Sequence, residues 1–183
     1  STRVLHGNWS SPALGTFAGQ EMVIFGGGDG FLYGFDTKPG KDEDGEPFLK
    51  ELWRCDGNPA HYRKDKKGKT LKYAKPEGPS EYIATPVIYK GKIFVPIGQD
   101  PEHGEGVGSM ACIDPTKRGD ITKTGKVWTY NKINRSISTV SVVDDLVYVG
   151  DFAGIVHCLD AKTGKAYWTH DTQGHIWAST LVT

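Results

Sequence analysis

The stretch DAKTGKAYW, residues 160–168, comes directly after the strand-like run GIVHCL at 154–159. An aspartate that ends a strand accepts hydrogen bonds from turn amides two or three residues later. Gly164 supplies the positive φ that a tight hairpin turn needs, and the returning strand then carries Trp168. The stretch therefore predicts a β-hairpin with a tryptophan on its second strand.

Two earlier stretches repeat this order with extra residues in the turn. They are YGFDTKPGK…ELW at 33–53 and ACIDPTKRGDITKTGKVW at 111–128, beside HCLDAKTGKAYW at 157–168. The equivalent positions are the aspartates Asp36, Asp114 and Asp160 and the tryptophans Trp53, Trp128 and Trp168. The hairpin is therefore one part of a repeated unit.

Two further elements recur around this hairpin. Small residues stand in WSS at 9–11, IAT at 83–85, IST at 137–139 and WAS at 177–179. Strand-like runs that end in glycine and aspartate stand at 22–30, 93–101 and 147–154. The order predicts a unit of four antiparallel strands, the first of them beginning with the small residues.

The spacing of the units is typical of a β-propeller. Thr139 and Ser179 are 40 residues apart, and four-stranded propeller blades have about 40–45 residues. The sequence therefore predicts an all-β partial propeller with three blades and the first strand of a fourth. The expected ranges are about 8–57, 81–131 and 136–171 for the three blades. The first strand of the fourth blade is expected at about 175–183, and an inserted loop at 57–80.

Each repeated tryptophan is expected to pack against the following blade. Burying such a ring removes about 150–250 Å² from water, so the aspartate, glycine and tryptophan are interpreted as a structural connection between blades. The small residues Ser10, Ala84, Ser138 and Ala178 are expected near the axis, where the strands converge.

The run Leu159-Asp160-Ala161-Lys162-Thr163-Gly164-Lys165-Ala166-Tyr167-Trp168 resembles the repeat of the pyrroloquinoline quinone (PQQ) propeller family. The family includes quinoprotein alcohol dehydrogenases, a propeller lipoprotein of the outer-membrane assembly machinery and PQQ-like proteins of planctomycete-type bacteria. The resemblance implies a ring of about seven or eight blades. It also implies PQQ and calcium in the catalytic members. Here there are no adjacent cysteines of the kind found beside that cofactor, and the calcium ligands and catalytic aspartate have no matching positions.

Composition excludes several classes of function. Among 183 residues, 22 basic and 22 acidic side chains balance, which gives no electrostatic reason to expect nucleic acid as a partner. No apolar run reaches the roughly 20 residues that span a bilayer, and the first residues lack the apolar core of a signal peptide. The cysteines Cys55, Cys112 and Cys158 are far apart and form no metal or redox motif.

Loops between strands two and three, and between strand four and the next blade, are expected on one face. That face would collect 26–30, 99–108 and 151–154 with 56–81, 131–135 and 171–175. Asp29, Asp100 and Asp151 are interpreted as turn caps. The loop 99–108 has two interpretations, a solvated polar loop and a divalent metal site. The metal ligands would be Asp100, Glu102, His103 and Glu105, which offer oxygen and nitrogen atoms within six residues.

Three functions remain open at this stage. A complete set of structural motifs without a catalytic constellation favours a non-catalytic scaffold that binds further blades or protein partners in the periplasm or cell envelope. The first alternative is a PQQ- and calcium-dependent oxidoreductase, with Trp9 and Trp177 beside the cofactor. The second is a propeller that binds carbohydrate or another ligand. The basic run 63–72 in the insert is interpreted first as a solvated loop, with contact to an acidic partner or polysaccharide as the alternative.

Overall fold

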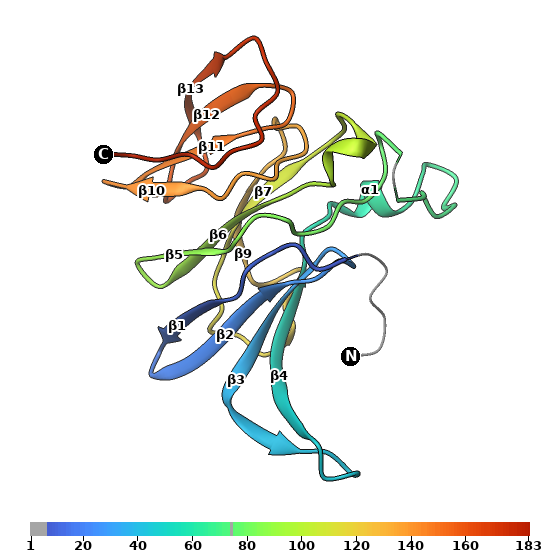
Figure 1. The fold of residues 1–183 in the computed structure, drawn as a ribbon, viewed down its shortest axis with the longest axis vertical. Coiled ribbons are helices and arrows are strands. Elements are labelled where there is room, and N and C mark those ends of the chain that lie inside the picture. The colour runs from blue at the N-terminus through green and yellow to red at the C-terminus, as the bar shows by residue number, and fades with distance from the viewer. Residues whose placement is uncertain (1–6, 74) are drawn as a thin grey trace.

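The computed structural model describes residues 7–73 and 75–183, and it shows three antiparallel sheets arranged side by side (Figure 1). The prediction of an all-β partial propeller is confirmed. Blade 1 consists of β1 (Ala13–Phe17), β2 (Gln20–Gly26), β3 (Phe31–Lys41) and β4 (Pro47–Asp56). Blade 2 consists of β5 (Val87–Tyr89), β6 (Lys92–Ile97), β7 (Ser109–Ile113) and β9 (Lys126–Tyr130). Blade 3 consists of β10 (Ser141–Val143), β11 (Leu146–Gly150), β12 (Ile155–Asp160) and β13 (Ala166–Asp171).

Three short elements lie outside this regular order. A single helical turn, α1 (Ala60–Arg63), lies in the insert, and a 3-10 turn covers Pro101–His103. The strand β8 (Gly119–Asp120) comes from the long β7–β9 turn of blade 2, but it pairs in parallel with β4 of blade 1. The extra residues of that turn therefore cover the outer edge of the preceding blade, which an unpaired strand would otherwise expose.

Both faces of blade 2 are buried, which places one hydrophobic cluster on each side of it. Ile93 and Val95 of β6 belong to the cluster shared with blade 1. Phe94, between them in sequence, belongs to the cluster shared with blade 3. Successive side chains of a strand point to opposite faces, so this middle sheet separates the two clusters.

A β-bulge occurs at the same point of every blade. The register shifts between Gly34 and Phe35 in blade 1, and at the matching points after Cys112 and Cys158 in the other two blades. The extra residue lies on the outer strand, one position before the repeated tryptophan, and is Leu52, Val127 or Tyr167. An extra residue bends and twists its strand, so the sequence repeat is also a repeat of backbone geometry.

The small-residue segments contact one another from blade to blade, although they come before the first strands rather than within them. The Ser10 hydroxyl donates to the Ala84 carbonyl at 3.0 Å, and the Ser138 hydroxyl donates to the Ala178 carbonyl at 2.6 Å. Ser10, Ala84 and Ser138 are buried. The close approach of equivalent residues explains why these positions are small.

The expected first strand of a fourth blade is not assigned as a strand at 175–183. In each blade the first strand pairs with the second strand of the same blade, as β10 does with β11. The described residues contain no second strand for a fourth blade. The segment instead lies beside blade 3, where the Ser141 hydroxyl donates to the Thr180 carbonyl at 2.7 Å.

Candidate functional site on the loop face

Loops from three parts of the chain meet at one end of the blades, as the sequence predicted. Arg135, between blades 2 and 3, donates from Nη1 to the His103 carbonyl at 3.2 Å and from Nη2 to the Lys75 carbonyl. The insert, the β6–β7 loop and the β9–β10 segment therefore share one polar centre. The sequence identified these loops but not Arg135 as the residue that joins them.

The Arg135 side chain is buried, with 1% of the residue exposed. A Cβ placed on Gly106 would lie 2.5 Å from Arg135 Cζ, so the guanidinium requires a glycine beside it. Burial lowers the pKa of Arg135, because water is replaced by protein around the charge. Nε has no hydrogen-bond partner among the residues that the structure describes.

Glu81 and Tyr73 form the second part of this centre. The Tyr73 hydroxyl donates to Glu81 Oε1 at 2.7 Å, and Glu81 is buried. Burial raises the pKa of Glu81 to about 7, and the negative charge of Asp100 acts in the same direction. The Glu81 amide donates to the Gly98 carbonyl at 2.8 Å, and the Gly98 amide donates to the Glu81 carbonyl at 2.9 Å. Burial therefore favours the neutral form of this carboxyl group, and the backbone pairing fixes the residue to blade 2.

The four predicted metal ligands do not gather into one cluster. His103 Nδ1 lies 2.8 Å from Asp100 Oδ2, whereas Glu105 approaches His175 at 3.8 Å. The side chain of Asp100 also accepts from the Glu102 amide at 3.1 Å and so caps the 3-10 turn. Within 7–73 and 75–183, no three His, Cys, Asp or Glu side chains are placed to hold a metal ion.

The other two predicted turn caps also accept hydrogen bonds from the amides that begin β3 and β12. Asp29 Oδ1 accepts from the Phe31 amide at 3.0 Å, and Asp151 Oδ1 accepts from the Ile155 amide at 3.1 Å. The two aspartates stand two and four residues before their partners, so the same turn is capped from different positions.

A cavity of about 170 Å³ lies between the insert and the β2–β3 turn of blade 1. The lining includes Asp29, Arg63, Thr70, Leu71, Tyr73 and Ser80. Arg63 is held in place by Asp56, with Nε–Oδ2 and Nη2–Oδ1 distances of 2.9 and 2.8 Å, and it also donates to the Asp29 carbonyl. The insert is therefore a structured wall of this cavity.

Sequence reasoning missed a buried polar network between blades 2 and 3. The Asp151 carboxylate, fully buried, lies 3.1 Å from His157 Nε2 and accepts from the Asn134 amide at 3.0 Å. His157 Nδ1 lies 3.2 Å from the Tyr130 hydroxyl. Burial alone would raise the pKa of Asp151, but these hydrogen bonds lower it. A histidine between apolar residues of β12 was the available signal.

Trp9 and Trp177, the residues suggested beside a cofactor, are both largely exposed, at 63% and 65%. The Trp177 ring lies edge-on to Phe152, with ring centres 5.7 Å apart, and Phe152 stacks on His175 at 4.5 Å. In the described residues, no group of three His, Cys, Asp or Glu side chains that could hold a metal ion lies beside either ring.

The three repeated tryptophans occupy different environments. Trp128 donates from Nε1 to the Ala161 carbonyl of blade 3 at 3.0 Å and is 9% exposed. Trp53 is fully buried in the cluster shared with blade 2, and its ring lies over Gly34 of its own blade, with its Nε1 at 3.3 Å from Met22 Sδ. Trp168 is 47% exposed. Blade 1 has a glycine where blades 2 and 3 have a cysteine, which gives the Trp53 ring room to lie on its own sheet.

The repeated aspartates all cap the turn that follows them. Asp36 Oδ1 accepts from the Lys38 amide at 3.0 Å, and Asp114 Oδ1 accepts from the Thr116 amide at 3.0 Å. Asp160 Oδ1 accepts from the amides of Lys162 and Thr163 at 3.0 and 2.8 Å, and its Oδ2 accepts from the Tyr167 hydroxyl at 2.8 Å. Gly164 has a φ of +70° in this turn.

Comparison with known proteins gives short sequence matches. No protein-family model matches the chain. A quinohemoprotein alcohol dehydrogenase of Comamonas testosteroni is 33% identical over 63 residues, which is 33% of this chain and 9% of that protein. A polyvinylalcohol dehydrogenase of Pseudomonas sp. is 35% identical over 52 residues, 28% of this chain and 8% of that protein. The matches therefore span less than a tenth of either relative.

Solved structures match over nearly the whole chain. The quinohemoprotein alcohol dehydrogenase of Comamonas testosteroni gives a TM-score of 0.59 at 12% identity, covering 92% of this chain and 31% of that one. BamB from Moraxella catarrhalis gives 0.50 at 17% identity, covering 90% and 37%. A computationally designed protein, Ika8, gives 0.53 at 13% identity, covering 97% and 41%.

The likeness to these solved structures, the bulged hairpin repeated in each blade and the three adjacent antiparallel sheets all indicate the same fold. Within the described residues no helix is long and apolar enough to cross a membrane. The chain therefore has the fold of the PQQ-like β-propellers, of which it forms three blades.

Proposed function

We propose that this chain is a segment of a larger PQQ-like β-propeller and acts as a non-catalytic assembly scaffold, binding further blades or partner chains through the open face of blade 3. The support comes from comparing that face with the matching face of blade 2. Phe94 and Trp128 have ring centres 5.9 Å apart and are covered by blade 3. Tyr148 and Trp168 repeat the pair at 6.0 Å, but Trp168 is exposed.

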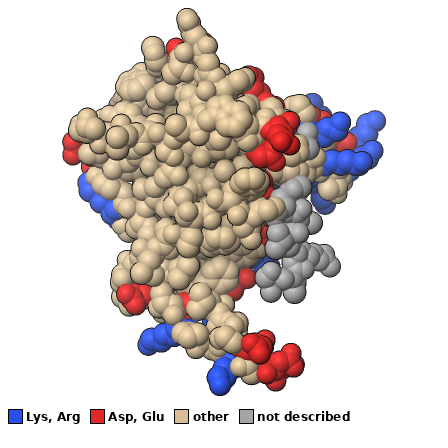
Figure 2. All heavy atoms as spheres, viewed as in Figure 1, with Lys and Arg blue, Asp and Glu red and all other residues tan. Residues whose placement is uncertain are grey.

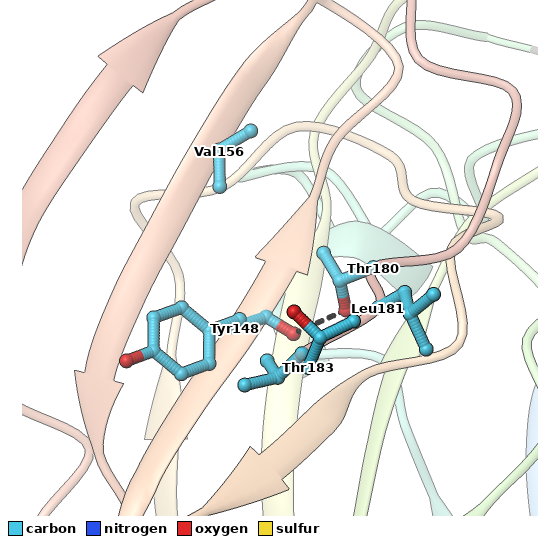
Figure 3. Close-up of a pocket in the computed structure, with 6 residues that line it drawn as sticks. Tyr148, Val156, Thr180, Leu181 and Thr183 are labelled. Carbon is cyan, nitrogen blue, oxygen red and sulfur yellow. Dashed lines mark hydrogen bonds between the residues drawn. The ribbon is translucent and has the colours of Figure 1, made fainter.

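A groove beside this pair extends the same open surface. Its volume is about 440 Å³, and Tyr148, Val156 and Thr180 are among the residues that line it (Figure 3). The Thr180 hydroxyl donates to the Tyr148 carbonyl at 3.1 Å and so fixes the terminal segment beside β11. Leu181 is 85% exposed. Large apolar side chains gathered at one sheet face are typical of a surface that another protein element covers.

The experiment is size-exclusion chromatography with light scattering on the chain alone and on a mixture with the remaining blades supplied as a separate chain. We expect self-association or complex formation, and Trp168→Glu should abolish it. Phe48→Glu is the matched control, because Phe48 is similarly exposed on the projecting β3–β4 hairpin. A monomer that binds no partner, or complexes that tolerate Trp168→Glu, would contradict the proposal.

The periplasm or cell envelope is the proposed location. Fractionation of the source cells, with an antibody against this chain, would test it directly. Recovery in the cytoplasmic fraction would contradict this part of the proposal without affecting the blade contact.

A redox role for the complete propeller is the second candidate, because the sequence matches are to two proteins named as dehydrogenases. Reconstitution of the complete ring with PQQ and calcium would test it. Dye-linked dehydrogenase activity together with quinone absorbance would support this candidate, and the absence of both in a folded ring would reject it.

A further inference from the structure

Three aspartates of this chain are followed directly by glycine. They are Asp29, Asp44 and Asp56. An aspartate in this position can close a five-membered succinimide ring with the next residue, because glycine has no side chain that keeps its backbone nitrogen away from the carboxyl carbon. The ring forms only where the carboxyl group and the following amide are free to turn toward each other.

The carboxylates of Asp29 and Asp56 are held in place by other groups. The Asp29 carboxylate accepts from the Phe31 amide at 3.0 Å and from the Tyr33 hydroxyl. Arg63 donates to both oxygens of the Asp56 carboxylate, at 2.8 and 2.9 Å. Neither carboxyl carbon can approach the next amide unless several charge-assisted hydrogen bonds, which are the strong ones, break first.

The glycines that follow these two aspartates are also fixed. Gly30 and Gly57 are buried, and the Gly57 amide donates to the Gly30 carbonyl at 2.9 Å. A Cβ built on Gly30 would collide with the Ser80 carbonyl oxygen, and one built on Gly57 would collide with the Tyr82 hydroxyl. This close packing leaves the backbone at both glycines no room to rotate into a ring.

Asp44 has the opposite surroundings, at the end of the β3–β4 hairpin. We call residues 42–46 the hairpin tip, and Figure 1 and Figure 2 show it projecting from the rest of the molecule with charged side chains on it. Asp44 and Gly45 are exposed, and the Asp44 carboxylate has no hydrogen-bond or ion-pair partner among the described residues. The Gly45 amide makes one turn hydrogen bond, to the Asp42 carbonyl at 3.0 Å. Exposed bonds of this kind open at a low cost in free energy.

We propose that Asp44 is a modification site that converts spontaneously to isoaspartate through a succinimide. The carboxylate takes up a proton, the Gly45 nitrogen bonds to the carboxyl carbon, and the carboxyl hydroxyl leaves with the amide hydrogen as water. Water then opens the ring, and the proton is released. Addition at the side-chain carbonyl restores aspartate, whereas addition at the main-chain carbonyl gives isoaspartate. Mass and charge are unchanged, but the backbone gains one methylene group.

The conversion alters the hairpin tip and leaves the blade unchanged. Asp42 Oδ1 accepts from the amides of Asp44 and Glu46 at 3.0 and 2.8 Å. An added backbone atom between residues 44 and 45 changes the spacing of the two amides that this one oxygen binds, so the tip is loosened. The hydrophobic clusters lie elsewhere, and the inference does not depend on further blades.

Peptide mapping of the 183-residue chain after prolonged incubation at mildly acidic pH tests the proposal. Trypsin separates the three aspartates into the peptides 4–41, 42–50 and 55–63. Isoaspartate appears as a second chromatographic peak of equal mass, and electron-transfer fragmentation locates it. In the folded chain, peptide 42–50 should convert at least about tenfold faster than the other two. In urea the three rates should become similar, because the restraints on Asp29 and Asp56 are lost.

Three variants of the tip identify the reaction. Asp44→Asn should react faster, because an amide loses ammonia without prior protonation of a carboxylate, and its product is recognised by the change in mass. Asp44→Glu keeps the charge but requires a larger ring, so peptide 42–50 should give no second peak. Gly45→Ala should slow the conversion about tenfold, because a methyl group hinders the attacking nitrogen. Circular dichroism of each variant shows that the fold is kept.

Three results would overturn the proposal. The first is a peptide 42–50 that converts in urea but not in the folded chain. The second is conversion of Asp29 or Asp56 in the folded chain as fast as that of Asp44. The third is a second peak that persists in Asp44→Glu, which would place the modification on another residue of that peptide.

Discussion

The indole of Trp128 in blade 2 lies directly against Gly164 in blade 3. A Cβ built on Gly164 would be 2.6 Å from Trp128 Cδ2, closer than real side chains approach. The indole Nε1 also donates to the Ala161 carbonyl, three residues before that glycine. The turn of one hairpin and the tryptophan of the preceding one therefore fit together as the contact between two blades.

Gly164→Ala should destabilise the chain by both backbone strain and overpacking. Gly45→Ala is the matched control, because Gly45 has a φ of +83° but nothing within 4 Å of its built Cβ. Urea unfolding should show that Gly164→Ala loses about 1–3 kcal/mol more than Gly45→Ala. Equal losses of unfolding free energy in the two variants would mean that the Trp128 indole moves away from the added methyl group without cost.

Trp128→Ala and Trp168→Ala should differ strongly in how far they lower the free energy of unfolding of this chain. Trp128 is almost fully buried, so its truncation should lower the free energy of unfolding by about 3–5 kcal/mol. Trp168 is half-exposed, and the corresponding loss should be less than about 1 kcal/mol. Denaturant titrations measure both losses of unfolding free energy. A loss for Trp168→Ala as large as that for Trp128→Ala would contradict the half-exposed position of Trp168.

Glu81 should make the chain less stable as the pH rises. Burial raises its pKa from 4.5 to about 7, so the folded state holds the proton more tightly than the unfolded state. This contribution is complete below pH 4.5 and is lost as the pH rises through 7. Glu81→Gln should remove the effect and stabilise the chain at pH 8 on the order of 1–3 kcal/mol relative to the original chain.

Glu77→Gln is the control for that experiment, because Glu77 is an exposed carboxyl in the adjoining insert. Thermal unfolding from pH 4 to pH 8 provides the measurement. A Glu81→Gln variant with the same pH profile as the original chain would rule out titration of Glu81 as the cause.

His157→Leu should leave the Asp151 carboxylate buried without its histidine partner. Removing one partner of a hydrogen bond to a buried carboxylate costs about 1–3 kcal/mol or more, because the carboxylate loses a donor that water cannot replace. Adding Asp151→Asn removes that charge, so the double variant should lose less than the sum of the two single variants. Additive losses in a double-mutant cycle would show that the two residues stabilise the fold independently.

Much of the fold was predictable from residues close together in sequence. The capping aspartates act within a few residues, so their pattern is visible in the sequence and recurs in each blade, and the positive-φ Gly164 belongs to the last of these turns. The grouping of loops on one face was also predictable, because strand order alone decides which turns lie at the same end.

Side-chain environments depended on contacts between distant segments. The sequence treated Asp100, Glu102, His103 and Glu105 as one group, but the structure divides them, because Glu105 approaches His175 of a later loop. Trp53 and Trp128 occupy equivalent positions, but a glycine on the paired strand places the Trp53 ring on its own sheet.

The sequence alone determined that the chain forms capped hairpins of propeller type, because the capping bonds arise within one turn. Tertiary structure alone decided which polar groups are buried together, as with Arg135 and the His103 carbonyl, 32 residues apart. Burial, and with it the pKa of Glu81 and the exposure of Trp168, depends on what the neighbouring blade covers, which no local pattern records.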